Sequence, residues 1–274
     1  MRTLIELFDI CNNRRDYTTI TRADGKKTYE VDYKFEEDDD GRTLYIYFEP
    51  SDGNVDWRVN FAYWRKPYKD MAVNYRVHGG FLESWKLIAD AIGAKIREVV
   101  EPEIDDDGHW NWKYKKIVIV GYSHGGALAA LCHEFVWYNR VDLRDGGVIG
   151  ISFDGPRIYG GLWVPQALRE RWAHFHVIRN ANDLITHLPP VVFLFRHVGH
   201  LEKVGALRPK AQVLKEWAAS HFKDKMLMQE LFNIKSHYPE EIKKGIMEIE
   251  DGRIEGLDTH THNFEVDSEN EIKE

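Results

Sequence analysis

The sequence contains no apolar run long enough to span a membrane. A transmembrane helix needs about 18 consecutive apolar residues, and the longest candidate, "LPPVVFLF", is interrupted by Pro189 and Pro190. Near the first residue, Glu6 and Asp9 interrupt what would be the apolar part of a secretory signal peptide. We therefore expect a protein that does not span a membrane and a cytoplasmic location by default, with secretion left open if the chain begins at a cleaved end.

Cysteine is scarce, with Cys11 and Cys132 the two in 274 residues. Two thiols permit at most one disulfide and form no metal-ligand cluster, so two unpaired thiols are expected. The acidic segment "EPEIDDDGHW" lacks the alternating ligands and the closing glutamate of an EF-hand, and no metal site is predicted there. Internal repeats and long low-complexity linkers are also missing, which favours one domain over residues 1–250 and a polar tail over residues 251–274.

The chain has fewer basic than acidic residues, with 37 lysines and arginines against 45 acidic residues, which gives a formal net charge of -8. A nucleic-acid binder would carry a net basic surface, so no nucleic-acid partner is expected. Nothing in the sequence identifies a protein partner. What the chain does contain is 43% apolar residues and 13% aromatic residues, enough for a sizeable core.

Two hydrophobic patterns indicate the fold class. Residues 27–50 alternate on both sides of Asp39, Asp40 and Gly41, which predicts an antiparallel hairpin near the N-terminus. Beyond residue 80, helical spacing alternates with short apolar runs, so we expect an α/β fold with a mainly parallel sheet and helices on both faces. The helical patterns cover residues 82–101 and 127–140, and the apolar runs cover residues 115–120, 146–155 and 174–183.

Ser123 lies in "GYSHGGALAA", directly after an apolar run and directly before a helical pattern. This is the strand-turn-helix setting of a nucleophile elbow, in which a strained turn exposes the serine hydroxyl. The residues two before and two after the serine must be small, because strand and helix approach closely there, and Gly121 and Gly125 occupy those positions. We interpret Ser123 as a nucleophile rather than as an ordinary turn serine.

A serine nucleophile needs a base and an orienting acid, and on this fold they follow it in the order acid, then histidine. Asp183 comes just after an apolar run and is the candidate acid, with Asp154 as its rival. The pattern alone does not choose the base. The histidines that follow Asp183 are His187, His197, His200, His221, His237, His260 and His262.

Seven segments in consistent order resemble the class 3 lipases, the fungal-lipase-like branch of the α/β-hydrolases. The likeness runs from about Tyr45 to Ile242. The segments are "YFEPSDGNVDWRVNF", "VHGGFLESW", "GYSHGGALAAL", "ISFDGPRIYG", "VIRNANDLITHLPP", "FRHVGHLEKVG" and "KSHYPEEI". The resemblance implies an α/β-hydrolase fold that needs no cofactor.

Roles follow from the matching positions. The resemblance implies that Ser123 is the nucleophile, Asp183 the acid and His237 the base, which leaves Asp154 with a structural role. The backbone N–H groups of His124 and Ser51 would form the oxyanion hole, although Glu49, Pro50 and Ser51 stand where the family usually has Arg-Gly-Thr.

A lid is implied over residues 61–76, which are aromatic and cationic in an acidic protein. This contrast suggests transient contact with an anionic lipid interface. An aromatic loop with internally balanced charges is the alternative. The residues expected to contact the interface or the substrate are Tyr63, Trp64, Arg65 and Lys66.

The function expected from these features is hydrolysis of a carboxylic ester, with an acylglycerol or phospholipid as the favoured substrate. A thioesterase or acyltransferase that uses the same triad remains an alternative. A lipid-binding pseudoenzyme is the other alternative, motivated by the unusual Glu49 and Pro50.

Overall fold

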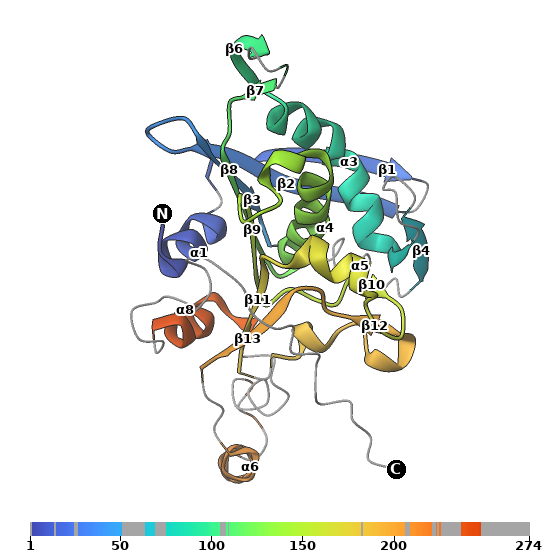
Figure 1. The fold of residues 1–274 in the computed structure, drawn as a ribbon. Helices are drawn as coiled ribbons and strands as arrows, with labels where there is room; N and C mark the ends of the chain where they lie inside the picture. The colour runs from blue at the N-terminus through green and yellow to red at the C-terminus, as the bar shows by residue number, and fades with distance from the viewer. Residues whose placement is uncertain are drawn as a thin grey trace.

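The structure is a computed structural model (Figure 1) that describes residues 2–13, 15–24, 27–50, 64–68, 75–104, 108, 110–181, 183–205, 209–220, 223, 225 and 237–247. Its centre is a seven-stranded sheet in the order β1-β2-β3-β8-β9-β11-β13. The strands β1, β2 and β3 pair antiparallel, and β3, β8, β9, β11 and β13 pair parallel. Their bounds are Thr18–Asp24, Lys27–Glu37, Thr43–Phe48, Lys116–Tyr122, Val148–Phe153, Phe175–Asn180 and His200–Val204.

Helices cover both faces of this sheet (Figure 1). Strand β8 shows why, because Ile117 and Ile119 enter the core under α3 and α4, while Val118 and Val120 enter the core under α1 and α8. A strand that is apolar on both sides is stable only when both sides are covered. The helix bounds are α1 Leu4–Asn12, α3 Gly79–Ile96, α4 His124–Asn139, α5 Gln166–Arg169, α6 Lys210–Ala219 and α8 Pro239–Met247.

Two smaller sheets flank the central one. A four-stranded sheet has the order β12-β10-β5-β4, and a two-stranded sheet pairs β6 with β7. Short 3-10 turns η1 to η4 complete the described elements. The bounds are β4 Arg65–Tyr68, β5 Tyr75–His78, β6 Val99–Ile104, β7 Trp110–Trp112, β10 Tyr159–Gly160, β12 Phe195–Arg196, η1 Val141–Leu143, η2 Glu170–Trp172, η3 Ile185–His187 and η4 Val191–Phe193.

The expected mainly parallel sheet and the N-terminal hairpin are confirmed, with β2 and β3 joined across Asp39 to Gly41. The helix expected over residues 82–101 ends at Ile96, because the β-branched Val99 and Val100 join β6 instead. Both cysteines are buried and unpaired, as expected. No described helix has the length and apolar character needed to cross a membrane. The proposed tail over residues 251–274 lies outside the described residues, and the domain boundary stays a prediction.

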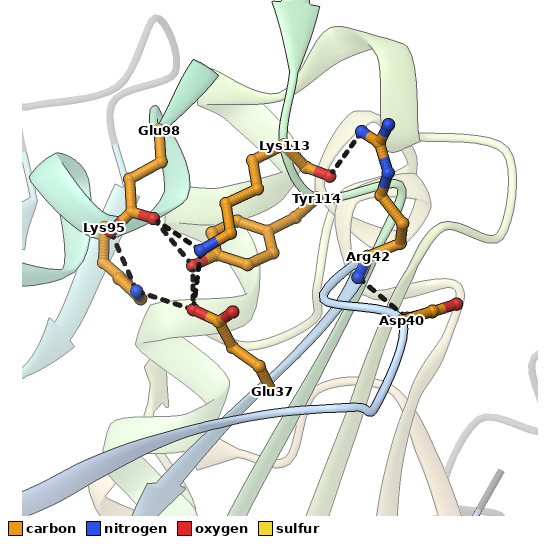
Figure 2. A network of polar contacts seen from close by, with 7 residues as sticks. All are labelled: Glu37, Asp40, Arg42, Lys95, Glu98, Lys113 and Tyr114. Atoms are coloured by element: carbon orange, nitrogen blue, oxygen red, sulfur yellow. Dashed lines mark hydrogen bonds and ion pairs between the residues drawn. The ribbon is translucent and has the colours of Figure 1, made fainter. Parts of the chain in front are cut away.

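A partly exposed ion-pair network joins three elements at the end of the central sheet where β8 begins (Figure 2). Glu37, at the end of β2, lies 2.9 Å from the ammonium groups of both Lys95 and Lys113. The hydroxyl oxygen of Tyr114 lies 2.7 Å from Glu37 and 2.9 Å from Glu98, so its one proton can be donated to either carboxylate. The network therefore ties β2, the last turn of α3 and the segment that leads into β8.

Substitution of Glu37 by Gln is expected to lower the free energy of unfolding by about 1 kcal/mol at neutral pH, a value kept small because solvent screens exposed ion pairs. Hydrogen bonds from Tyr114, Lys95 and Lys113 lower the pKa of Glu37 to about 2 from its usual 4.5. A lowered pKa stabilises the folded state above the unfolded-state value, and this contribution disappears as the pH falls through the folded-state value.

The difference between wild type and Glu37→Gln should therefore shrink as the pH falls from about 4.5 toward about 2. Urea denaturation over a series of acidic pH values measures it. Asp39→Asn is the control, because Asp39 is an exposed acid in the adjacent turn. A Glu37→Gln effect that does not change with pH would contradict the assignment.

Candidate active site

Ser123 lies in the tight turn between β8 and α4. Its backbone has φ 54° and ψ -119°, a strained conformation for a residue other than glycine. The Ser123 N–H donates to the Phe153 carbonyl at 2.9 Å, which fixes the turn to the end of β9. Ser123 is 8% exposed, and its side chain makes no capping bond to its own helix, so its hydroxyl is available to another partner.

Glycine is required on both sides of this turn. A Cβ at position 121 would collide with the carbonyl group of Gly125, and a Cβ at position 125 would collide with the carbonyl groups of Phe48 and Glu49. The strand, the helix and the end of β3 therefore approach to backbone contact. This is the packing that the Gly-x-Ser-x-Gly spacing predicts.

Ser123, His237 and Asp183 form one chain of hydrogen bonds. The Ser123 Oγ lies 2.8 Å from Nε2 of His237, and Nδ1 of the same ring lies 2.7 Å from Oδ2 of Asp183. With the proton on Nδ1, the ring donates to the carboxylate and accepts from the serine hydroxyl. Asp183 is fully buried, while the His237 side chain is 14% exposed. The arrangement can transfer a proton from the serine to the imidazole.

The loop after Asp183 is held by several hydrogen bonds. The Ile185 N–H donates to Asp183 Oδ1 at 3.0 Å, and the Thr186 hydroxyl donates to the Asp183 carbonyl at 2.8 Å. His197 in turn donates from Nε2 to the Thr186 carbonyl at 2.7 Å. The guanidinium group of Arg157 donates to the carbonyl groups of residues 187 and 189. Ile185, Thr186 and Arg157 were not assigned a role from the sequence, although Arg157 lies in the Gly-Pro-Arg segment that carried the resemblance.

His237 is held from the opposite side. The Tyr122 hydroxyl donates to the His237 carbonyl, and the two ring centroids are 5.4 Å apart. Two residues further on, α8 begins and anchors the segment through the buried side chains of Ile242 and Ile246. Tyr122 directly precedes Ser123, so the same residue adjoins Ser123 and holds His237.

The other candidate histidines lie elsewhere. Nε2 of His197 donates a hydrogen bond to the Thr186 carbonyl, and burial lowers the pKa of His197 to about 3. His200 begins β13 and donates to the Ala173 carbonyl at 3.0 Å, at the opposite edge of the sheet from Ser123. His187 is in η3, and its carbonyl accepts from Arg157. His221, His260 and His262 lie outside the described residues.

His124 is the first residue of α4, so its backbone N–H lies at the helix N-terminus, next to Ser123. Its side chain is buried, its ring packs edge-on against Phe81, and burial lowers its pKa to about 4, so it is neutral near pH 7. The helix N-terminus carries partial positive charge beside Ser123. Ser51, the other expected oxyanion donor, lies outside the described residues.

Part of the expected lid is a strand. Arg65 and Lys66 begin β4, which pairs with β5, and Trp64 precedes it with 36% of its surface exposed. The Lys66 ammonium forms an ion pair with Glu83 at 2.8 Å. This pair is what the alternative interpretation predicts, in which the basic side chains of this segment are balanced by nearby acids. Tyr63 lies outside the described residues.

Asp154, the rival acid, also lies beside the hydrogen-bond chain. Asp154, Asp183 and His237 each present a polar atom within 4.8 Å of the others. Three such groups can hold a metal ion, but both ring nitrogens of His237 are occupied by Asp183 and Ser123. The donor set therefore fits proton transfer better than metal binding.

Comparisons with known proteins identify the family of the chain. The family model described as Lipase (class 3) matches residues 45–193, more than half of the chain. A lipase of Rhizomucor miehei is 22% identical over 171 residues, which cover 62% of this chain and 44% of that protein. The secreted mono- and diacylglycerol lipase 1 of Fusarium solani is 26% identical over 144 residues, which cover 52% of this chain and 38% of that protein.

Among solved structures, the Rhizomucor miehei lipase propeptide complex aligns with a TM-score of 0.50 and 21% identity, over 69% of this chain and 57% of that chain. Lipase II of Rhizopus niveus aligns with a TM-score of 0.50 and 18% identity, over 69% of this chain and 66% of that chain. These likenesses confirm the α/β-hydrolase fold. The chain matches about two fifths of the length of its curated relatives.

Substitution of His237 by Ala is expected to slow the labelling of Ser123 by a fluorophosphonate at least about 100-fold, because a general base contributes 100-fold or more. Labelling is followed by mass spectrometry. His200→Ala is the matched control and should label at close to the wild-type rate, because His200 lies at the far edge of the sheet. Equal rates for the two variants, or an adduct on another residue, would contradict the assigned base and nucleophile.

Proposed function

Because the chain belongs to the class 3 lipase family, we propose that it is a serine hydrolase that cleaves carboxylic esters of lipids, such as acylglycerols or phospholipids. The observation that carries the proposal is the continuous hydrogen-bond chain from Ser123 through His237 to Asp183. Ser123 acts as the nucleophile, His237 as the base and Asp183 as the orienting acid. These side chains supply the nucleophile and the proton transfers that an acyl transfer to water needs.

The reaction has two stages. Ser123 Oγ attacks the ester carbonyl carbon while its proton passes to Nε2 of His237, and the imidazolium then returns a proton to the departing alcohol. Water attacks the acyl-enzyme through the same base, which releases the carboxylic acid and restores the serine. Asp183 keeps the ring in the tautomer that accepts from Ser123 and stabilises the imidazolium.

The negative oxygen of the intermediate is stabilised by backbone donors. We assign this role to the N–H of His124, the first residue of α4, and to the N–H of Ser51 as the second donor. Such a donor contributes about 3 to 4 kcal/mol to the transition state. The neutral ring of His124 lines the site. It does not act as the base, because the Ser123 hydroxyl already forms a hydrogen bond with His237.

The substrate reaches the site from a lipid surface, and exposed apolar side chains support this part of the proposal. Gly161 N donates to the Leu194 carbonyl at 2.8 Å, which brings the segment after β10 beside the segment before β12. Large apolar side chains are 49% to 78% exposed on these two segments, namely Leu162, Trp163, Val192 and Phe193. Surfaces of this kind mark contacts with membranes or partners. The second segment follows the Asp183 loop directly.

Arg65 is assigned to contact anionic headgroups at this surface. Its side chain reaches across β5 toward Gly160, where an added Cβ would lie 2.9 Å from its Cδ. Lys66 is assigned a weaker contribution, because Glu83 already pairs with it. Trp64 is assigned to the same contact region.

The expected cytoplasmic location stays a prediction. The Fusarium solani relative is a secreted lipase by name, which sits against that expectation.

Ser123→Ala is expected to lower ester hydrolysis at least about 1000-fold, because the nucleophile acts as a unit with its base. The melting temperature should stay close to wild type, since the hydroxyl fills no core volume. Turnover is measured on a panel of oxygen esters and thioesters that vary in acyl length and head group. Thr43→Ala is the control, because it removes a hydroxyl at the start of β3, at the opposite edge of the sheet.

The panel separates the alternatives. Turnover of thioesters alone favours a thioesterase, and transfer to an added alcohol favours an acyltransferase. Wild-type protein that neither turns over any ester nor reacts with a fluorophosphonate would support the pseudoenzyme and contradict the proposal.

Arg65→Glu is expected to slow hydrolysis of anionic phospholipid vesicles several-fold more than hydrolysis of a soluble short-chain ester. Each basic residue contributes about 1 kcal/mol to attraction by an anionic membrane, and salt screens this attraction. Lys115→Glu makes the same charge change at an exposed position before β8, at the other edge of the sheet. Equal effects on both substrates, or no dependence on salt, would remove Arg65 from the interface.

A further inference from the structure

Asp154 is a buried acid for which the proposed mechanism has no use. It follows β9 directly, is fully buried, and has φ 46°, in the left-handed region that few residues other than glycine adopt. Its backbone N–H donates to the Ile178 carbonyl at 2.8 Å, so the conformation is pinned by the neighbouring strand β11. Strained residues of this kind cluster at functional sites.

The hydrogen bonds of the two neighbouring acids differ. Asp183 accepts from Ile185 N on Oδ1 and from His237 Nδ1 on Oδ2, so both of its oxygens are occupied by donors. Asp154 accepts from Asn180 N on Oδ1 at 2.7 Å, while its Oδ2 has no hydrogen-bond partner among the described residues. A carboxylate is stabilised by the donors it accepts from. The donor count therefore favours charge on Asp183 and a proton on Oδ2 of Asp154.

The charged and titratable neighbours of Asp154, taken together, also favour its protonated form. Asp183 and His237 lie within 4.8 Å of it, and two carboxylates this close in a dry site do not both ionise readily. Arg179, from β11, is buried and attracts a negative charge, but no ion pair joins it to Asp154 in the described structure. The Tyr122 hydroxyl is occupied by the His237 carbonyl.

The titration behaviour agrees with the hydrogen-bond count. Burial, and next the negative charge of Asp183, raise the pKa of Asp154 well above its ordinary value. The hydrogen bond from Asn180 and the charge of Arg179 lower the pKa without reversing this direction.

We propose that Asp154 is a positioning residue that holds its proton in the folded enzyme, which leaves Asp183 as the one carboxylate that orients His237. An ionised Asp154 would offer the imidazole a second carboxylate within 4.8 Å and would compete with Asp183 for the ring. The positioning role rests on the proposed function, whereas the protonated state of Asp154 does not.

The test compares the thermal stability of wild type and Asp154→Asn from about pH 4 to about pH 8. A pKa raised in the folded state gives stability that is full below the unfolded-state pKa of 3.8 and lost as the pH rises through the folded-state pKa. The neutral amide of Asn lacks this loss. The melting temperature of Asp154→Asn relative to wild type should therefore rise by several degrees as the pH rises. An Asp154 that is ionised in the folded state predicts almost no change over this pH range, because the residue is then ionised in the folded and unfolded states alike. A flat or opposite slope therefore overturns the proposal.

The same comparison in an Asp183→Asn background tests the link to the triad. Removal of the Asp183 charge removes one of the two causes that hold the proton on Asp154, so the slope should become clearly smaller. An unchanged slope would show that the proton of Asp154 is independent of Asp183, and would overturn the positioning role.

Infrared spectroscopy provides a test that needs no folded variant. Wild-type protein with isotope-labelled aspartate should show the carbonyl band of a protonated aspartic acid at neutral pH, and Asp154→Asn, where it folds, should lack it. Absence of the band from wild type overturns the proposal. None of these measurements involves ester hydrolysis, so failure of the proposed function, seen as unlabelled Ser123, is distinguishable from failure of this inference.

Discussion

Contact between backbones at Gly121 and Gly125 is the constraint on which the site depends. The end of β8, the first turn of α4 and the end of β3 meet there without side chains between them. The closeness sets the sharp turn at Ser123 and brings the first N–H groups of α4 toward the nucleophile. A second close approach, in which Gly126 and Gly155 pack around Ser152, places the segment after β9 beside the same helix. Asp183 then comes from the loop after β11, and His237 comes from the segment just before α8.

The charge balance of the site follows from this crowding. Asp183, His237 and Asp154 lie within 4.8 Å of one another in a buried region, so each ionised group must be matched by donors or by an opposite charge. Asp183 meets this requirement through the N–H of Ile185 and the imidazole. In the proposed mechanism His237 takes the serine proton, and the imidazolium and the Asp183 carboxylate then form a pair with no net charge. A protonated Asp154 leaves that pair undisturbed.

Local features of this fold were predictable from the sequence, and long-range ones were not. The turn at Ser123 and the hairpin before Phe48 each depend on a short run of consecutive residues. Small residues indicate the turn, and alternating apolar and polar residues indicate the hairpin strands. The four-stranded sheet was not anticipated, since β10 and β12 are two residues long and carry no periodicity. The base needed the family resemblance, because seven histidines follow Asp183. The closeness of Asp154 to Asp183 depends on the register of Phe153 opposite Ile178, which no single segment encodes.

Charged side chains are stabilised differently at the two edges of the central sheet, and this difference indicates which edge is expected to carry the chemistry. At the edge where β8 begins, the network around Glu37 and Lys113 is partly exposed, and Glu37 and Glu98 each form an ion pair with Lys113 (Figure 2). Water screens such pairs, so they add modest stability and no reactivity. At the edge where β8 ends, the acids are buried and are held by backbone N–H groups. The low dielectric of the buried region strengthens electrostatic interactions there. The transfer of one proton between neighbouring groups therefore changes the interaction energies of all the charged groups at this edge. Chemistry is therefore expected where desolvated charge is held by rigid backbone, which in this chain is the carboxyl edge of the parallel strands.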